Sequence, residues 1–138
     1  MKTWMAMAVS AVLIGIGAAQ VLAHGDGAPQ PVDTTGLKPL GEDWVPENPY
    51  RGDAKAIEIG ARGYNSNCAR CHGLDVKSGG MAPDLRAVEP NAEGDSWFVA
   101  RVRGGAMRGD AVKMPPFEGL LSQEAVWAIK SYVDAQPD

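Results

Sequence analysis

The run Cys68-Ala69-Arg70-Cys71-His72 constrains this 138-residue chain more than any other feature, and it contains both of its cysteines. A C-x-x-C-H run is the attachment signature of a c-type haem. Two residues between the cysteines let one helical turn present both sulfurs to the vinyl groups of the porphyrin. The next side chain, His72, then points at the iron. We therefore predict one covalent haem c on Cys68 and Cys71, with His72 as an iron ligand.

Two other chemistries use a C-x-x-C pair. A zinc site needs further Cys or His ligands, and the second histidine, His24, lies far upstream. A thiol-redox pair reads best beside a βαβ pattern, and the sequence shows none. Both alternatives stay open at this point, but haem attachment explains the added histidine better.

The first 23 residues have the pattern of a signal peptide. Lys2 supplies a positive start, an uncharged and mostly apolar run follows, and Val21-Leu22-Ala23 ends in small residues. We expect cleavage after Ala23 and export to the periplasm, where c-type haem is attached in bacteria. An uncleaved membrane anchor is the alternative, since the run is long enough for one. Cleavage would leave no stable membrane insertion.

Size and charge limit the classes of function. Residues 24–138 are enough for a single domain with a modest core. The net charge of −4 becomes −5 without Lys2, so nucleic acid is an unexpected partner. Because both cysteines are committed to haem, no disulfide is expected despite the oxidising compartment.

Residues 24–52 form a proline-rich lead whose prolines fix φ and remove backbone donors, so we expect an extended segment. A disordered tail is the alternative, although Trp44, Val45 and Tyr50 favour packing of its second half. The domain proper is expected at residues 53–138. We expect residues 24–30 to be mobile.

Helical periodicity dominates the rest of the chain. We expect a first helix from Asp53 to about Asn65, and a short one over 97–103 capped by Asp95 or Ser96. A last helix, capped by Ser122, runs to about Ala135. No run of residues reads as a strand, so the predicted class is all-α, with three to five helices and long loops around the haem. The first helix should bury one face: Ile57, Gly60, Ala61 and Tyr64.

A haem that only carries electrons needs a ligand on its second face. Downstream of residue 23 the candidates are Met81, Met107 and Met114. Thioether sulfur favours ferrous iron and raises the reduction potential. We choose Met114, because Pro115-Pro116 stiffen the backbone that would hold it at the iron. Any of the three methionines could instead fill space in the core.

Two further residues are assigned to the haem environment. The carbonyl of Pro83 is expected to accept a hydrogen bond from the His72 ring, which would fix its orientation; an ordinary turn proline is the alternative. The stretch from residue 101 to residue 113 contains four basic residues and one acidic residue: Arg101, Arg103, Arg108 and Lys113, and Asp110. We hypothesise that Arg101 or Arg103 pairs with a haem propionate and that this stretch orients a partner. Simple solvation of these arginines is the alternative.

Together these residues resemble a class I, mono-haem cytochrome c over about residues 54–135. The landmarks follow in order: the helix with Gly60 and Tyr64, the C-x-x-C-H run, the Pro83 loop and Met114-Pro115. The resemblance implies an electron-transfer role and a contact between the first and last helices. Gly60, Tyr64, Trp127 and Tyr132 would lie at that contact.

A narrower resemblance is to the cytochrome c-L-like periplasmic electron acceptors of pyrroloquinoline quinone (PQQ)-dependent alcohol dehydrogenases. It is carried by the proline-rich lead ending Glu47-Asn48-Pro49-Tyr50-Arg51-Gly52, by residues 67–74 and by residues 79–86. It implies that the chain is no enzyme but takes single electrons from such a dehydrogenase. It would pass them to a terminal oxidase or another cytochrome.

Two other functions remain open. Without the methionine ligand an open iron could sense gases or act as a peroxidase, but no histidine is placed as a distal acid–base group. A carrier for another respiratory pathway is equally compatible with these motifs.

Overall fold

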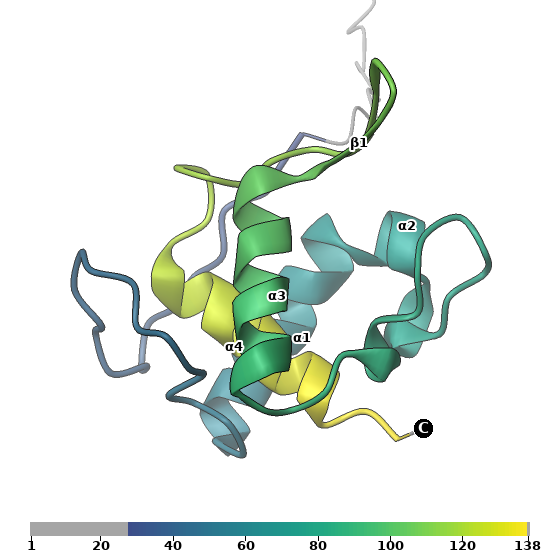
Figure 1. Cartoon of the computed structure of the whole chain (residues 1–138). Coiled ribbons are helices and arrows are strands. Elements are labelled where there is room, and N and C mark those ends of the chain that lie inside the picture. Colours follow the sequence, from purple (N-terminus) through teal and green to yellow (C-terminus); the bar gives the residue numbers. More distant parts are fainter. Residues whose placement is uncertain (1–27, 138) are drawn as a thin grey trace, which may run out of the picture.

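The computed structural model describes residues 28–137; the expected signal peptide and His24 lie outside them. Residues 28–137 form four α-helices, two short 3₁₀ turns and one small β-hairpin (Figure 1). The predicted helical fold class is confirmed. No helix within residues 28–137 is both long and apolar enough to span a bilayer. The elements are α1 (Ala54–Asn67), α2 (Ala69–His72), η1 (Leu74–Val76), η2 (Leu85–Ala87), α3 (Ala92–Gly104), β1 (Ala106–Arg108), β2 (Ala111–Met114) and α4 (Gln123–Asp134).

Helices α1 and α4 pack directly on each other and make the centre of the fold. Gly60 permits this contact, because a Cβ atom there would lie 1.9 Å from the carbonyl oxygen of Ala128. One turn further on, the rings of Tyr64 and Tyr132 meet with centroids 5.4 Å apart. The expected contact is therefore present. The buried face of α1 is only partly as predicted: Ile57 and Ala61 are half-buried, whereas Ala56, Ile59 and Gly63 are buried with Gly60 and Tyr64.

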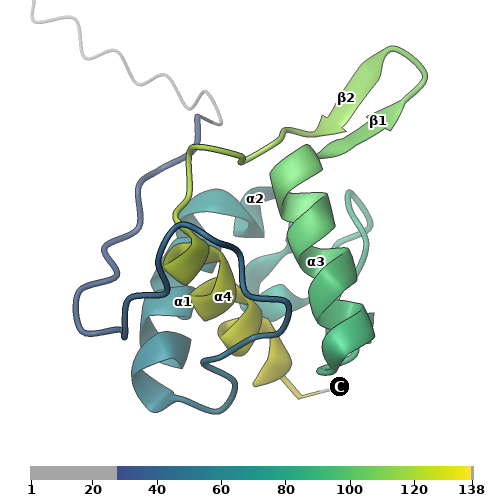
Figure 2. The ribbon, with the colours of Figure 1, turned by 60° about the vertical axis from the view of Figure 1, so that its left-hand side comes forward.

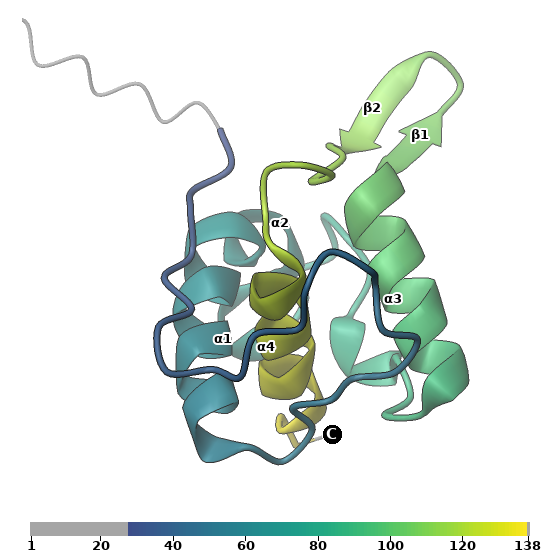
Figure 3. The same cartoon turned by 90° about the vertical axis from the view of Figure 1, so that its left-hand side faces the viewer.

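The proline-rich segment, called the strap here (residues 28–52), lies across α1 and α4 as an irregular chain with several turns (Figure 3), whereas the sequence predicted an extended segment. The side chain of Gln123, at the start of α4, accepts from Val45 N at 2.7 Å and donates to the Asp43 carbonyl at 2.9 Å. Tyr50 is buried, and Trp44 and Val45 are half-buried. The strap therefore supplies backbone partners and apolar cover to a helix that is buried on nearly every face.

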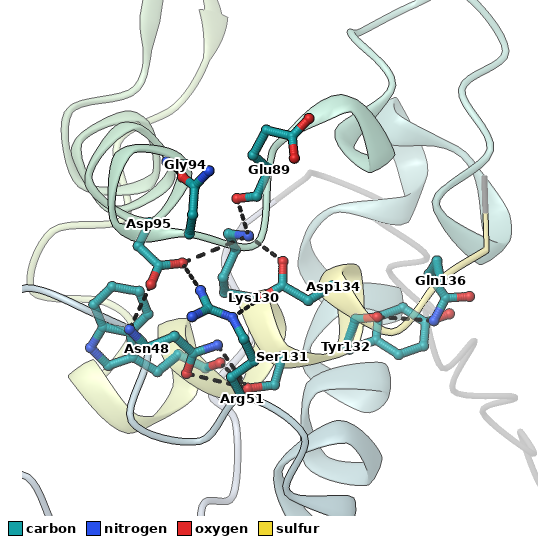
Figure 4. Close-up of polar contacts among 12 residues, drawn as sticks. Asn48, Arg51, Glu89, Gly94, Asp95, Lys130, Ser131, Tyr132, Asp134 and Gln136 are labelled. Carbon is teal, nitrogen blue, oxygen red and sulfur yellow. Dashed lines mark hydrogen bonds and ion pairs between the residues drawn. The ribbon is translucent and has the colours of Figure 1, made fainter.

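A buried ionic cluster fixes the end of the strap (Figure 4). Asp95 and Lys130 are both fully buried and lie 3.7 Å apart. Asp95 also accepts from Asn48 N at 2.8 Å and from Arg51 Nη2 at 2.6 Å, while Lys130 pairs with Asp134. Buried charges are tolerated when each is paired in this way. The cluster therefore joins the strap, α3 and α4.

This cluster explains why the predicted start of α3 was wrong. The helix begins at Ala92, where the Asn91 side chain accepts from Gly94 N at 3.0 Å. Asp95 and Ser96, the two expected caps, both lie inside the helix, and Asp95 is bound there by its ionic partners. The hairpin of β1 and β2 was not predicted either; it projects from the end of α3, away from the helices (Figure 2).

Candidate haem site

The predicted attachment turn is helical and continues α1. Cys68 N donates to Tyr64 O at 2.7 Å, and His72 N donates to Cys68 O at 2.9 Å. Tyr64 also donates its hydroxyl to the Gly73 carbonyl at 2.8 Å. The turn is thus held at both ends by the same buried tyrosine. Cys68, Cys71 and His72 share one helical turn, as thioether attachment with an adjacent iron ligand requires.

The His72 ring is buried, and its Nδ1 lies 2.8 Å from the carbonyl oxygen of Pro83. A carbonyl only accepts, so Nδ1 carries the proton and Nε2 keeps its lone pair. This is the tautomer that a metal ligand needs, and the contact fixes the ring's orientation. The structure therefore brings the His72 ring and the Pro83 carbonyl together, and the role of this contact in orienting an iron ligand stays a prediction.

Cys68 and Met114, 46 positions apart in the sequence, line the same apolar cavity. Met114 is half-buried there, whereas Met81 and Met107 are 77% and 61% exposed. The side chains that line it are apolar, as contact with the faces of a porphyrin requires, but the cavity itself is only about 10 Å³ and has room for roughly one water molecule. Besides Cys68 and Met114, its walls are Phe98, Val102, Phe117, Leu121, Val126 and Ile129.

The backbone around Met114 is closely constrained. Gly105 has φ +70°, in the left-handed region, and a Cβ atom there would lie 2.5 Å from the Met114 carbonyl oxygen. Phe117 N donates to Val102 O at 2.9 Å on the far side of the two prolines. The segment that carries Met114 is therefore tied to the end of α3 at two points.

Charge and burial argue against the alternative uses of the cysteines. Burial raises the pKa of the Cys68 thiol to about 12, whereas redox cysteines have lowered pKa values. Within residues 28–137, no group of three or more His, Cys, Asp or Glu side chains is placed to hold a metal ion. A zinc site and a thiol-redox site both lose support.

The arginines assigned to a propionate have protein partners in the structure. Arg103 pairs with Glu118, with Nη2 3.0 Å from the carboxylate, and its guanidinium lies 4.6 Å from the Trp44 ring centroid. Arg101 donates to the Gly105 carbonyl at 3.2 Å. A propionate would have to compete with Glu118 for Arg103.

Comparison with known proteins identifies the family. The family model described as "Cytochrome C oxidase, cbb3-type, subunit III" matches residues 55–133. Cytochrome c550 of Pseudomonas aeruginosa is 57% identical over 129 residues, 90% of this chain and 89% of that protein. The chain belongs to the class I c-type cytochromes. As in other cytochromes c, haem c with its iron is bound covalently, and the protein is an electron carrier.

Two more distant matches are to a quinohemoprotein alcohol dehydrogenase and to the structure of a cytochrome c-L. Quinohemoprotein alcohol dehydrogenase ADH-IIG of Pseudomonas putida is 36% identical over 81 residues, 59% of this cytochrome but 11% of the dehydrogenase. The crystal structure of cytochrome c-L from Methylophaga aminisulfidivorans covers 75% of the cytochrome and 73% of that chain, with a TM-score of 0.53. At 23% identity this likeness shows the fold alone.

The residues present fit haem c. The turn offers two thiols and one imidazole with a free Nε2, and the facing segment offers a thioether beside an apolar cavity. Sequence reasoning missed four residues of the cavity wall. Phe98 and Val102, four residues apart, gave a usable helical signal. Phe117 and Leu121 lie in and beside turns, where no periodic pattern marks them.

Proposed function

We propose that this cytochrome is a periplasmic one-electron carrier that accepts electrons from a PQQ-dependent alcohol dehydrogenase. Cleavage after Ala23 would release residues 24–138 as the mature protein. The main support is that Cys68 and Met114 line one apolar cavity, and that the His72 ring, on the same helical turn as Cys68, has its orientation fixed by the Pro83 carbonyl. The similarity to a segment of quinohemoprotein alcohol dehydrogenases supports the choice of donor.

Haem c supplies an iron that alternates between two oxidation states. In the proposal, Cys68 and Cys71 would hold the haem by thioether bonds, and His72 Nε2 and Met114 Sδ would be the iron ligands. Pro83 keeps His72 in the ligating tautomer, and the apolar walls exclude water. Ligands that stay in place keep reorganisation small, which suits transfer of an electron and no bond chemistry. A terminal oxidase or another cytochrome would be the acceptor.

The test is to mix the purified ferric cytochrome with a PQQ alcohol dehydrogenase and its alcohol, and to follow haem reduction in a stopped-flow instrument. We expect rapid reduction that requires both alcohol and enzyme. The reduced protein should bind carbon monoxide slowly, because Met114 closes the iron. Absence of reduction contradicts the proposed donor. Rapid carbon monoxide binding would instead indicate the open-iron alternative, a gas sensor or peroxidase.

A further inference from the structure

The loop that follows α2 returns the chain to His72. Residues 73–87 leave the attachment turn and bring Pro83 back, so that its carbonyl oxygen lies 2.8 Å from His72 Nδ1. Proline has no backbone N–H, so Pro83 cannot fix its own position by donating a backbone hydrogen bond. The place of its carbonyl therefore depends on the residues on either side of it.

Asp84, directly after Pro83, is held by Arg86 in a two-pronged ion pair. Arg86 Nε lies 3.0 Å from Asp84 Oδ1, and Arg86 Nη2 lies 2.7 Å from Oδ2. The backbone amide of Arg86 also donates to Oδ1 at 3.0 Å. Most surface ion pairs contribute little, but a two-pronged arginine–carboxylate contact fixes orientation as well as distance. The Asp84 carboxylate is therefore fixed relative to the backbone of residue 86.

The same segment is attached to the body of the protein just after the ion pair. Leu85 is buried in the core cluster that also contains Tyr64. Arg86 Nη1 donates to the carbonyl of Pro137, beyond the end of α4, at 3.3 Å. Only 23% of the Arg86 side chain is exposed. The ion pair thus connects the backbone that follows Pro83 to two fixed parts of the fold.

Ser78 constrains the chain on the other side of Pro83. Its hydroxyl donates to the carbonyl of Ala82, the residue before Pro83. Hydrogen bonds from the Arg86 side chain and backbone lower the pKa of Asp84 to about 2, and the Ser78 backbone adds a smaller effect of the same sign. Pro83 is therefore enclosed between two polar anchors, and Asp84 belongs to the second of them.

We propose that the Asp84–Arg86 ion pair is a positioning element for the iron ligand, because it holds the Pro83 carbonyl against His72 Nδ1. Both residues act through the Pro83 backbone. A hydrogen bond from Nδ1 makes an imidazole a stronger donor to a metal, and the more highly charged ferric iron gains more from a stronger donor. The intact pair should therefore keep the reduction potential low. This inference rests on the proposed ligation by His72.

The test separates position from charge, because the two partners carry opposite charges. By charge alone, Asp84→Asn would raise the midpoint potential of the haem-loaded protein and Arg86→Gln would lower it. A looser His72 contact raises the potential in both. Arg86→Lys keeps the charge and loses the two-pronged geometry, so it should raise the potential as well. It is also the mildest of the three changes, if the others disturb folding.

The potentials are best measured at high salt, where partly exposed charges are screened. We expect each variant to change the ferrous-to-ferric equilibrium about threefold to tenfold, and tenfold corresponds to about 59 mV for one electron. Matched controls are Glu58→Gln and Arg62→Gln, which remove an exposed ion pair of 2.6 Å on α1. Both controls should keep the wild-type potential.

A second measurement follows the His72 ring directly. In the ferrous protein labelled with ¹⁵N-histidine, the Nδ1 proton should exchange slowly with water and resonate far downfield, because it is hydrogen-bonded to Pro83. In the three variants it should exchange several-fold faster and move upfield. A purely structural role for the ion pair would lower thermal stability and leave this signal and the potential unchanged.

Three results would count against the inference. A wild-type potential and Nδ1 signal in Arg86→Lys and Asp84→Asn, with His72 still bound to iron, would overturn the positioning role and leave the proposed ligation intact. Opposite shifts of potential in Asp84→Asn and Arg86→Gln, with the Nδ1 signal unchanged, would show an effect of charge alone. If His72 in the wild-type protein lacks the NMR shifts of an iron-bound imidazole, the ligation fails and the positioning role fails with it.

Discussion

Replacing Gly60 with alanine tests the contact on which the fold depends. In an ordinary helix interior this change gains about 1 kcal/mol. Here the new Cβ would lie 1.9 Å from the Ala128 carbonyl oxygen and 2.5 Å from its carbon. Carbon–oxygen contacts below 3.0 Å are essentially never seen for Cβ atoms, so α1 and α4 must separate by roughly 1 Å.

Overpacking of this kind costs about 1–3 kcal/mol. The upper value applies, because the obstacle is backbone and cannot rotate away. Set against the helical gain, the net loss is about 2 kcal/mol of unfolding free energy. For a domain of this size that corresponds to a fall in Tm of roughly 10 °C.

The assay is thermal unfolding of the haem-loaded protein followed by circular dichroism. Gly104→Ala is the matched control: this residue ends α3, and its Cβ would meet nothing within 4 Å. Gly104→Ala lowers the conformational entropy of the unfolded chain as Gly60→Ala does. The control should therefore be as stable as wild type or slightly more stable. A Gly60→Ala protein at least as stable as Gly104→Ala would refute the reasoning.

Three other outcomes follow from local geometry. Gly105→Ala places a side chain at φ +70°, a cost of about 1–2 kcal/mol, and the new Cβ atom pushes on the Met114 carbonyl. Potentiometric titration should show a lower midpoint potential for the haem, and an unchanged potential contradicts the proposed ligation. Hydrogen bonds from Arg86 lower the pKa of Asp84 to about 2, so this pairing should stabilise the fold above about pH 4 and be lost as pH falls through 2. A carboxyl NMR titration with its midpoint near 4 would contradict it. Gln123→Ala should speed amide hydrogen exchange at Val45 while the core of α1 stays protected; unchanged exchange there would show that the side chain does not hold the strap.

Features that depend on contacts between neighbouring residues in the chain were predictable from the sequence. Asp53 and Ser122 accept from backbone amides at 2.9 and 3.2 Å and start α1 and α4 as expected, because a cap is a contact between neighbours in the chain. The C-x-x-C-H turn and the fold class are readable for the same reason. The contact of α1 with α4 came from the family resemblance.

What the sequence did not predict depends on residues that are far apart. Asp95 looks like a helix cap until the strap brings Asn48 and Arg51 to it, and the cap of α3 is instead Asn91, four residues earlier. The hairpin has strands of three and four residues, too short for an alternating pattern to stand out. The pairing of Arg103 with Glu118 spans a loop, and no local pattern marks it.

The most direct test of the account is the ferric absorption spectrum of Met114→Ala beside that of Met81→Ala. A methionine on ferric haem gives a weak charge-transfer band near the red end of the spectrum. We expect Met81→Ala to keep this band, since Met81 is 77% exposed, and Met114→Ala to lose it. A band that survives in Met114→Ala would contradict closed coordination by His72 and Met114.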